Sequence, residues 1–401
     1  MSMERDVVVV GGGIVGLATA HQLLQRRPDL RVTVLEREAA VGQHQSSRNS
    51  GVLHAGLYYP PGSAKARWSR AGKLAMERFC QENGVPAERR GKVVVAVRTE
   101  ELPGLRALAE RARTNGVEIH DLDAEGIKEH EPHVTGVAGI WTPETAVTDF
   151  GAVCRALAAN IEQAGGEVRT GVTLTGLEER SDLVRIETDA GPLEARTTVV
   201  CAGLQSDRIL AMSGIRASER IVPFRGSWLE LRPGLSHLVR GNVYPVPAGG
   251  LPFLGVHLTR RIDGAVWIGP NAVLAPAREG QRPWSVSPRD LAEVARFGGI
   301  WRLARQHSSV AVGEVWRDRV LPALLREVQR YVPEITRRDV RRGPWGVRAQ
   351  LVAPDGSLVD DFKIRTTGRI LHVLNAPSPA ATASLSIGDE LSERVAERIA
   401  S

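Results

Sequence analysis

The feature that most constrains this chain is a short β-branched run at 6–10 that ends at glycines and is followed by helical periodicity. Gly11, Gly13 and Gly16 have the spacing G-x-G-x-x-G, and Glu36 ends a second strand twenty residues beyond Gly16. Such glycines let a pyrophosphate approach a helix N-terminus, and the carboxylate can accept ribose hydroxyl hydrogen bonds. The pattern predicts a βαβ unit that binds a dinucleotide, with a purely structural glycine turn as the alternative. It does not separate FAD from NAD, but Glu36 argues against NADP because a 2′-phosphate would meet its charge.

Length and charge set further limits. A chain of 401 residues suggests two domains, and 52 Lys+Arg against 46 Asp+Glu leave a net charge of +6. The densest basic run, at 337–342, contains an acid and no interleaved aromatic residue, so we predict a solvated face and no nucleic-acid partner. A weakly basic surface remains compatible with a peripheral contact with anionic lipid.

The cysteines and the N-terminal segment indicate a compartment. Cys80, Cys154 and Cys201 are isolated, which argues against a disulfide framework and a metal site and fits a reducing environment. Glycines and polar residues interrupt the apolar stretch at 7–24, which makes it a poor membrane span, and strand signals begin too early for a signal peptide. We therefore expect a cytoplasmic protein, with peripheral contact at the inner face of the membrane as a possibility.

Hydrophobic periodicity and Gly or Pro punctuation predict the remaining elements. Segment 223–269 is typical of an antiparallel sheet, because short alternating runs in it are separated by Pro and Gly. Helices are expected at 72–83, 102–115, 150–164, 289–304, 317–331 and 380–399, and strands at 31–36, 92–97, 168–174, 183–188, 197–203, 226–231, 242–246, 265–269, 343–352 and 370–375.

A polar loop at 42–59, rich in Ser, Gly and His, is long for a compact domain and therefore typical of a functional loop. Its segment QSSRNSGVLHAGLYY, at 45–59, resembles the L-2-hydroxyglutarate oxidase/dehydrogenase family of the FAD-dependent amine and hydroxy-acid oxidase superfamily. The resemblance runs from end to end of the chain. It is also carried by KAR at 65–67, YPVP at 244–247, PFLGVHLTR at 252–260, IDG at 262–264, GPNAV at 269–273, GVRAQ at 346–350, LVDDF at 358–362 and NAPSPAATAS at 375–384.

The resemblance implies an α/β fold, with a Rossmann-like FAD-binding domain and a discontinuous, mostly antiparallel β-sheet substrate domain. We expect 1–80, 145–220 and 340–401 in the FAD-binding domain, and 81–144 and 221–339 in the substrate domain.

It also implies where the chain contacts FAD. The Ser-rich loop offers hydroxyl donors and a guanidinium to a pyrophosphate, although it can instead satisfy its own turns. Free N–H groups of the helix that follows Pro379 would face the flavin N1/C2=O edge, unless this is an ordinary helix start. The predicted cofactor contacts are Gly11, Gly13, Ile14, Val15, Gly16, Glu36, Arg37, Ser46, Ser47, Arg48, Asn49, Val172, Ala202, Gly203, Ser378, Ala380, Ala381 and Thr382.

For the substrate, the family's chemistry needs cationic forks, which are guanidinium groups that bind a carboxylate with two parallel hydrogen bonds, and a base for the hydroxyl proton. Arg225 and Arg348 lie in apolar strand segments and are expected as forks, with structural ion pairs as the alternative. His257 is the first choice for the base, although a core histidine remains open. His54 could orient substrate or flavin, act as the base, or attach the flavin covalently, and Tyr244 completes the predicted catalytic set.

The implied activity is FAD-dependent oxidation of a small dicarboxylic L-2-hydroxy acid, L-2-hydroxyglutarate to 2-oxoglutarate, with hydride transfer to flavin N5 and electrons passed to quinone or oxygen. The alternatives are an amino-acid or amine oxidase on the same scaffold, a pyridine-nucleotide dehydrogenase, and a flavin-binding protein with little turnover. Two segments depart from the family pattern. Ser227–Leu229 replaces an acid and paired tyrosines, and 248–250 (AGG) replaces a more polar turn. Both changes border the expected substrate pocket and leave the flavin chemistry intact.

Overall fold

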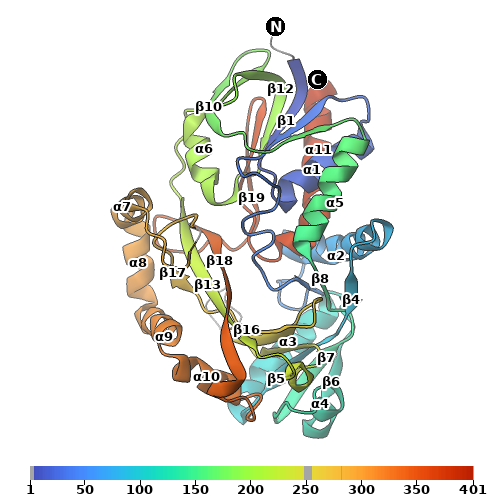
Figure 1. Ribbon diagram of the computed structural model, residues 1–401, viewed down its shortest axis with the longest axis vertical. Helices are drawn as coiled ribbons and strands as arrows, with labels where there is room; N and C mark the ends of the chain where they lie inside the picture. Colours follow the sequence, from blue (N-terminus) through green and yellow to red (C-terminus); the bar gives the residue numbers. More distant parts are fainter. Residues whose placement is uncertain (1–3, 248–254, 281, 401) are drawn as a thin grey trace.

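Two large β-sheets organise the molecule in the computed structural model, which describes residues 4–247, 255–280 and 282–400 (Figure 1). In the first sheet, β1 (Glu4–Val10) lies parallel between β2 (Val32–Leu35) and β12 (Leu193–Val200), and β20 (Ile370–Asn375) follows in parallel beyond β12. This parallel core confirms the nucleotide-binding sheet that the glycine pattern predicts. The sheet is completed by β9 (Glu167–Arg169), β10 (Leu174–Glu179), β11 (Val184–Thr188) and β19 (Lys363–Thr367).

The second sheet is mostly antiparallel, as predicted, and its one described parallel pairing joins β5 (Lys92–Ala96) to β14 (Asn242–Pro245). Its longest strands are β13 (Arg220–Leu231) and β18 (Val340–Val352), which pair along almost their whole length. The other members are β6 (His120–Leu122), β7 (Ala138–Thr142), β15 (His257–Arg260), β16 (Val266–Gly269) and β17 (Val273–Leu274); β3 (Val52–Leu53), β4 (Ala87–Arg89) and β8 (Ala146–Thr148) form a separate three-stranded sheet.

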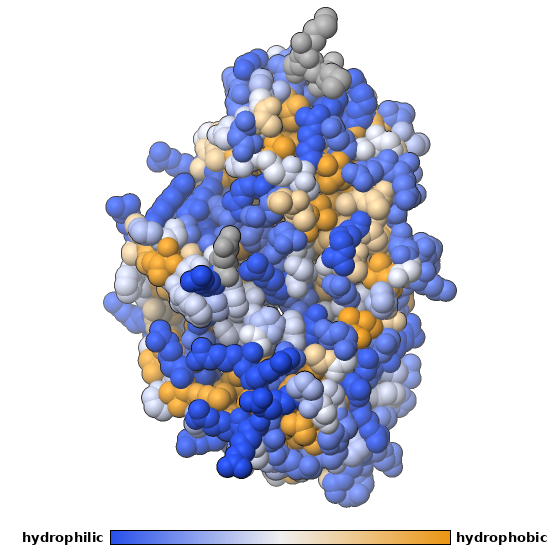
Figure 2. Space-filling model, in the orientation of Figure 1, coloured by the Kyte–Doolittle hydropathy of each residue, from blue (hydrophilic) through white to orange (hydrophobic). Residues whose placement is uncertain are grey.

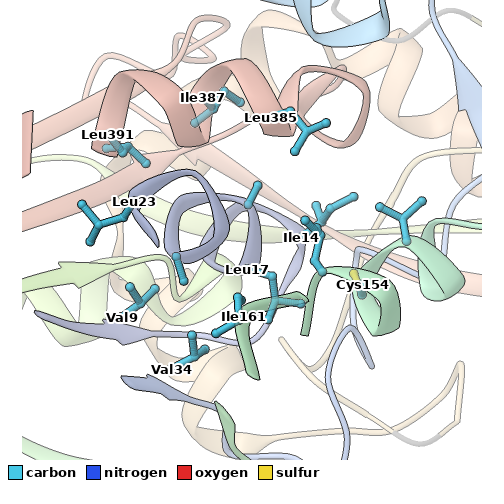
Figure 3. Packing of buried hydrophobic residues seen from close by; sticks show 14 of the residues in the cluster. Val9, Ile14, Leu17, Leu23, Val34, Cys154, Ile161, Leu385, Ile387 and Leu391 are labelled. Carbon is cyan, nitrogen blue, oxygen red and sulfur yellow. The ribbon is translucent and has the colours of Figure 1, made fainter. Parts of the chain in front are cut away.

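Helices cover these sheets. The helix α1 (Ile14–Arg26) packs between the first sheet and α11 (Ala380–Ala400), and Figure 3 shows its apolar side chains meeting those of α11, α5 and the strands. Each fully buried Leu or Ile there contributes roughly 1.5–3 kcal/mol of burial free energy, which fixes the helix start against the sheet. The others are α2 (Ala64–Glu82), α3 (Leu102–Thr114), α4 (Ala124–His130), α5 (Phe150–Gln163), α6 (Ser206–Met212), α7 (Pro288–Arg296), α8 (Gly298–Gln306), α9 (Ser308–Arg319) and α10 (Leu321–Gln329).

The structure divides three of the expected elements and places one expected segment in the other sheet. The strand expected at 168–174 breaks after Arg169, because Gly171 has a positive φ of 71° and turns the chain. The helix expected at 289–304 divides before Gly298, and the helix expected at 317–331 divides before Leu321. The segment 340–352, expected in the FAD-binding domain, pairs with β13 in the second sheet instead. Over the described ranges, no helix is long and apolar enough to cross a membrane.

Candidate active site

A cavity of about 1190 Å³ is lined by residues of both large sheets. The glycine turn after β1 borders it, together with Glu36 and Arg37, and His257 and Tyr244 line it from the second sheet. The loop 42–59, the N-terminal end of α11 and the segment after β12 supply further walls. The predicted site residues are therefore gathered around one cavity, except Gly16 and Ser47, which do not line it.

The glycine turn owes its shape to close backbone packing. Gly11 has a φ of +112°, and a Cβ there would lie 2.4 Å from the carbonyl oxygen of Cys201. A Cβ on Gly16 would lie 2.0 Å from the carbonyl oxygen of Gly11. Gly16 thus holds the turn together, whereas Gly13 and Ile14 face the cavity with the open N-terminus of α1. Val15 lines the cavity as well.

Glu36 is oriented by the backbone around it. Its Oε2 accepts the N–H of Gly12 at 2.7 Å, and its Oε1 accepts the N–H of Glu38 at 2.8 Å. Arg37 donates to Glu38 and to Glu279, at 3.0 and 2.5 Å. The carboxylate at the end of β2 is consequently held at the cavity wall, where ribose hydroxyls can reach it.

Several polar side chains of the Ser-rich loop form hydrogen bonds within the loop or to the neighbouring helix start. Ser46 Oγ accepts the N–H of Ile14 at 3.0 Å, and Ser47 Oγ donates to the carbonyl of Gly42 at 2.6 Å. Asn49 Nδ2 donates to the carbonyl of Ser46 at 2.7 Å. For Ser47 and Asn49 the structure thus shows the alternative interpretation, a loop that satisfies its own turns. Arg48 lines the cavity with its guanidinium carbon 5.1 Å from the ring centre of Trp345.

Two further segments approach the cavity through backbone. Val172 lines it, and its N–H donates to the carbonyl of Glu36 at 2.9 Å. Ala202 and Gly203 line it where β12 ends. These positions are where a chain in an open α/β sheet passes close to a bound dinucleotide.

The start of α11 forms a second helix N-terminus at the cavity. Ser378, Ala380, Ala381 and Thr382 all line it. Thr382 Oγ1 accepts the N–H of His54 at 3.2 Å, so its hydroxyl ties the loop to the helix. Because the first N–H groups of a helix have no partner inside it and carry partial positive charge, this end suits an anionic acceptor.

These features fit FAD. Two helix N-termini border the cavity, one at the glycine turn for a pyrophosphate and one at α11 for the edge of an electron-rich ring. The hydroxyl of Tyr58, which also lines the cavity, is buried and has no hydrogen-bond partner among the described residues, so it remains available to a bound molecule. Fold and cavity together define a dinucleotide-binding α/β protein.

His257 has a defined tautomer. Its Nδ1 lies 3.0 Å from the carbonyl oxygen of Gly255, which can only accept, so Nδ1 carries the proton and Nε2 has the free lone pair. The ring stacks on Tyr244 with centroids 4.0 Å apart and is 7% exposed. Burial, reinforced by the charge of Lys92, lowers the pKa of His257 to about 3. The imidazole is therefore neutral at physiological pH, and the lone pair of its Nε2 can accept a hydrogen bond from a hydroxyl group.

Lys92 is a buried cation beside the predicted site residues His54 and Tyr244, and sequence reasoning missed it. Its side chain on β5 is 1% exposed, and its Nζ lies 4.2 Å from the ring centre of Tyr244 and 3.5 Å from Nδ1 of His54. Burial lowers the pKa of Lys92 to about 7. While Lys92 is protonated it can only donate, so His54 Nδ1 accepts and His54 Nε2 carries the proton. Burial and the neighbouring Lys92 also hold the pKa of His54 well below its usual value. The two histidines thereby take opposite tautomers.

Further cations stand on the cavity wall. Arg348 lines it, and burial lowers the pKa of its guanidinium against the opposing effect of Asp360, although an arginine remains charged. Lys65, also missed from the sequence as a site residue, lines the cavity with Nζ 2.7 Å from Oδ1 of Asp360. Lys65 and Arg348 can bind carboxylates.

Arg225 is engaged elsewhere. Its two terminal nitrogens donate to Oδ2 of Asp318 and to the carbonyl of Pro283, each at 2.6 Å. The alternative interpretation of this residue, a structural ion pair, is what the structure shows, even though Arg225 lines the cavity. Residues 248–254, which include one departure from the family pattern and part of the PFLGVHLTR segment, lie outside the described residues.

Comparison with known proteins identifies the family. The model of the FAD-dependent oxidoreductase family DAO matches residues 6–394. The mitochondrial L-2-hydroxyglutarate dehydrogenase of Caenorhabditis elegans is 44% identical, over 98% of this chain and 94% of the relative. L-2-hydroxyglutarate dehydrogenase of Escherichia coli K12 is 43% identical, over 99% of this chain and 94% of the relative. The chain therefore belongs to the FAD-dependent oxidoreductases and, within them, to the family of these L-2-hydroxyglutarate dehydrogenases, and its cofactor is FAD.

Solved structures show the same fold at lower identity. L-α-glycerophosphate oxidase from Mycoplasma pneumoniae, with FAD bound, superposes with a TM-score of 0.80 at 21% identity over 98% of this chain and 95% of that chain. L-proline dehydrogenase from P. horikoshii superposes with a TM-score of 0.75 at 16% identity over 99% and 94%. This fold serves both C–O and C–N substrates in those proteins, so the substrate has to be argued from the site.

Proposed function

We propose that this protein oxidises L-2-hydroxyglutarate to 2-oxoglutarate. The names of its relatives support this proposal, and one observation in this structure carries it. Neutral His257 lines a cavity with the cations Lys65 and Arg348, and buried Lys92 contacts the ring of Tyr244 on which His257 stacks. A dicarboxylic hydroxy acid is a dianion at neutral pH, and it needs such cations together with an uncharged base.

In this proposal each residue has one task. Arg348 and Lys65 bind the substrate carboxylates, and Nε2–H of His54 donates a hydrogen bond to the substrate. Nε2 of His257 takes the hydroxyl proton while the hydrogen on C2 leaves with its electron pair, and the negative charge of the bound dianion raises the pKa of the imidazole for this step. FAD, when bound, supplies the acceptor for that hydride. Tyr244 supports the His257 ring by stacking and faces Lys92 with its π surface.

The same cations argue against the amino-acid oxidase alternative. The amino group of an amino acid is protonated at neutral pH, and it would enter a cavity lined by Arg348, with Lys92 buried behind its wall against Tyr244 and His54. Two like charges about 4 Å apart repel each other by about 4 kcal/mol at an effective dielectric constant of about 20. A neutral hydroxyl carries no such cost. Membership of a FAD-dependent family also leaves no role for the pyridine-nucleotide alternative.

The proposal extends to acceptor and place. Electrons pass from the reduced protein to a quinone, at a peripheral contact with the inner face of the cytoplasmic membrane. Oxygen is the competing acceptor, and the rate of reoxidation by air against that by a soluble quinone analogue separates the two.

The test of the substrate is an anaerobic visible spectrum before and after addition of L-2-hydroxyglutarate, with D-2-hydroxyglutarate, malate and glutamate as comparisons. We expect a yellow protein that is bleached by the L-isomer and not by the D-isomer or glutamate. Bleaching by glutamate alone would establish the amino-acid oxidase alternative. A yellow protein that none of the four compounds bleaches would keep FAD and reject the substrate.

A further inference from the structure

The helices α7, α8 and α9 present apolar side chains to solvent. Trp301 on α8 is 62% exposed, Val312 on α9 is 71% exposed and Trp316 on α9 is 59% exposed. Trp284 and Val286, just before α7, are exposed as well. Figure 2 shows apolar residues among charged ones along the edge that these helices occupy in Figure 1. Scattered exposed apolar residues are normal, but this many within one short stretch of chain are not.

The helix α9 has its polarity reversed relative to an ordinary surface helix. On one face, Glu314 accepts the N–H of Ala272 and Asp318 bonds Arg225, so the acids point toward the protein. On the other face, Val312, Val315 and Trp316 follow the i, i+3, i+4 spacing and are exposed. A surface helix normally buries its apolar stripe and exposes its polar one. The apolar stripe of α9 is therefore available to something other than this protein's core.

The exposed charges of this region have one sign. Every exposed charged residue between 282 and 319 is an arginine, whereas the acids Asp290, Glu293, Glu314 and Asp318 are buried or half-buried in contacts with the protein. The arginines are Arg282, Arg289, Arg296, Arg302, Arg305 and Arg319. Exposed tryptophan and valine within a rim of arginine match an anionic bilayer interface, where apolar side chains enter the headgroup boundary and cations meet lipid phosphates.

We propose that the outer face of α7–α9 is a docking surface for an anionic lipid bilayer. A second copy of this chain fits the face less well, because a twofold contact would bring arginines of one copy against those of the other. Binding is interfacial, since no described helix is long and apolar enough to span a bilayer.

The position of this surface suits a transfer of electrons from the cavity to a membrane. Ser287 and Arg289 of the α7 start line the cavity, and so does Glu314 of α9. The layer that would rest on lipid thus also forms one wall of the active-site cavity. Delivery of electrons to a lipid-dissolved quinone rests on the proposed function, whereas the lipid surface itself does not depend on the substrate.

The test is flotation of the FAD-loaded protein with vesicles, without substrate. One set of vesicles is phosphatidylcholine and the other an equimolar mixture of phosphatidylcholine and phosphatidylglycerol. We expect binding to the mixed vesicles, and a loss of about tenfold or more in partition for Val312→Glu/Trp316→Glu, because two charges then occupy the apolar stripe. The control Leu74→Glu/Val137→Glu adds the same charge at exposed apolar positions outside this surface and should bind like the wild type.

Flavin absorbance and turnover with a soluble acceptor should be unchanged in both double variants, which shows that they are folded. The proposal is overturned if the wild type does not bind mixed vesicles, or if the Val312/Trp316 variant binds as well as the wild type. It is also overturned if light scattering shows a wild-type dimer that this variant converts to a monomer, because a second copy would then cover the face.

Discussion

At the scale of single residues, the structure shows a role for lysines that could not be recognised from the sequence alone. The cations are almost all arginine, and only Lys65, Lys73, Lys92, Lys128 and Lys363 are lysine. Three of these five, Lys65, Lys73 and Lys92, are buried. An ammonium is compact and can lose its proton when desolvated, whereas a guanidinium stays charged and needs a wide planar site. Lys65 and Lys92 therefore occupy positions that fit a compact cation whose pKa is lowered by burial.

Lys92 should control the alkaline side of catalysis as a positioning residue. Its ammonium holds His54 Nδ1 as an acceptor and attracts the dianionic substrate, so kcat/KM should fall as pH rises through about 7 and Lys92 loses its proton. In Lys92→Met, kcat/KM should be low and lack this limb, and in Lys92→Arg the limb should move to higher pH. A Lys92→Met variant with the wild-type pH profile would contradict this role.

The same variant should be more stable than the wild type. Folded Lys92 has a pKa of about 7 against an ordinary value of 10.5, so the unfolded chain binds more protons between these pH values and wild-type stability rises with pH there. The advantage of Lys92→Met should therefore shrink by about 2–3 kcal/mol between pH 6 and pH 9. Denaturant unfolding at the two pH values measures it, and an advantage independent of pH would show that Lys92 is not buried as a cation.

His257 should be needed for proton removal and dispensable for FAD. Its Nδ1 bonds the backbone of Gly255 and its ring stacks on Tyr244 of the second sheet, whereas the glycine turn follows a strand of the first sheet, so His257→Asn should keep the flavin spectrum. We expect kcat to fall by about 10²–10⁴-fold, the usual contribution of a general base. Stopped-flow flavin reduction measures this step directly. If His54→Asn gives the larger loss while His257→Asn reduces flavin normally, the roles of the two histidines are exchanged.

At the scale of elements, hydrophobic periodicity was sufficient to predict a helix or strand whose own residues show the pattern clearly. The βαβ unit and α11 lie where periodicity predicts them, because their apolar positions pack into one hydrophobic core. The assignment of 340–352 was wrong for a physical reason, since its partner β13 is more than a hundred residues away and pairing at that range leaves no local trace. From the sequence, Arg225 could be either a carboxylate-binding residue or a member of an ion pair. Its partner Asp318, on α9, comes close to it only in the folded protein.

Two glycines of one motif should separate fold from cofactor binding. A Cβ on Gly16 would meet the carbonyl oxygen of Gly11 at 2.0 Å, so Gly16→Ala should destabilise even the FAD-free protein, by about 1–3 kcal/mol. A Cβ on Gly13 would meet only Ser46 Oγ at 3.4 Å, so Gly13→Ala should leave that protein stable and weaken FAD binding by crowding the cavity. Thermal unfolding and flavin titration measure the two effects. Equal destabilisation of the FAD-free protein by both would refute the distinction.

At the scale of the whole molecule, the site is a product of distant segments. His54 follows β3, Lys92 lies on β5, Tyr244 on β14 and His257 on β15, and their contacts arise only because β5 and β15 both flank β14. Residue types that suit the chemistry were recognisable in the sequence, notably His257 and Arg348. The hydrogen-bond partners that set tautomer and charge were not, because they depend on this strand order.

The first sheet is built from both ends of the chain, since β12 lies between β1 and β20, and the whole second sheet is made in between. On a ribosome, β1 and the glycine turn emerge before the second sheet, and β20 and α11 emerge after it. Until β20 and α11 have emerged, residues 198–200 of β12 lack their partner strand on one edge, and the α11 end that lines the cavity is missing. FAD can therefore bind only after α11 has been synthesised. A chain whose translation stops before α11 should lack bound flavin and be colourless.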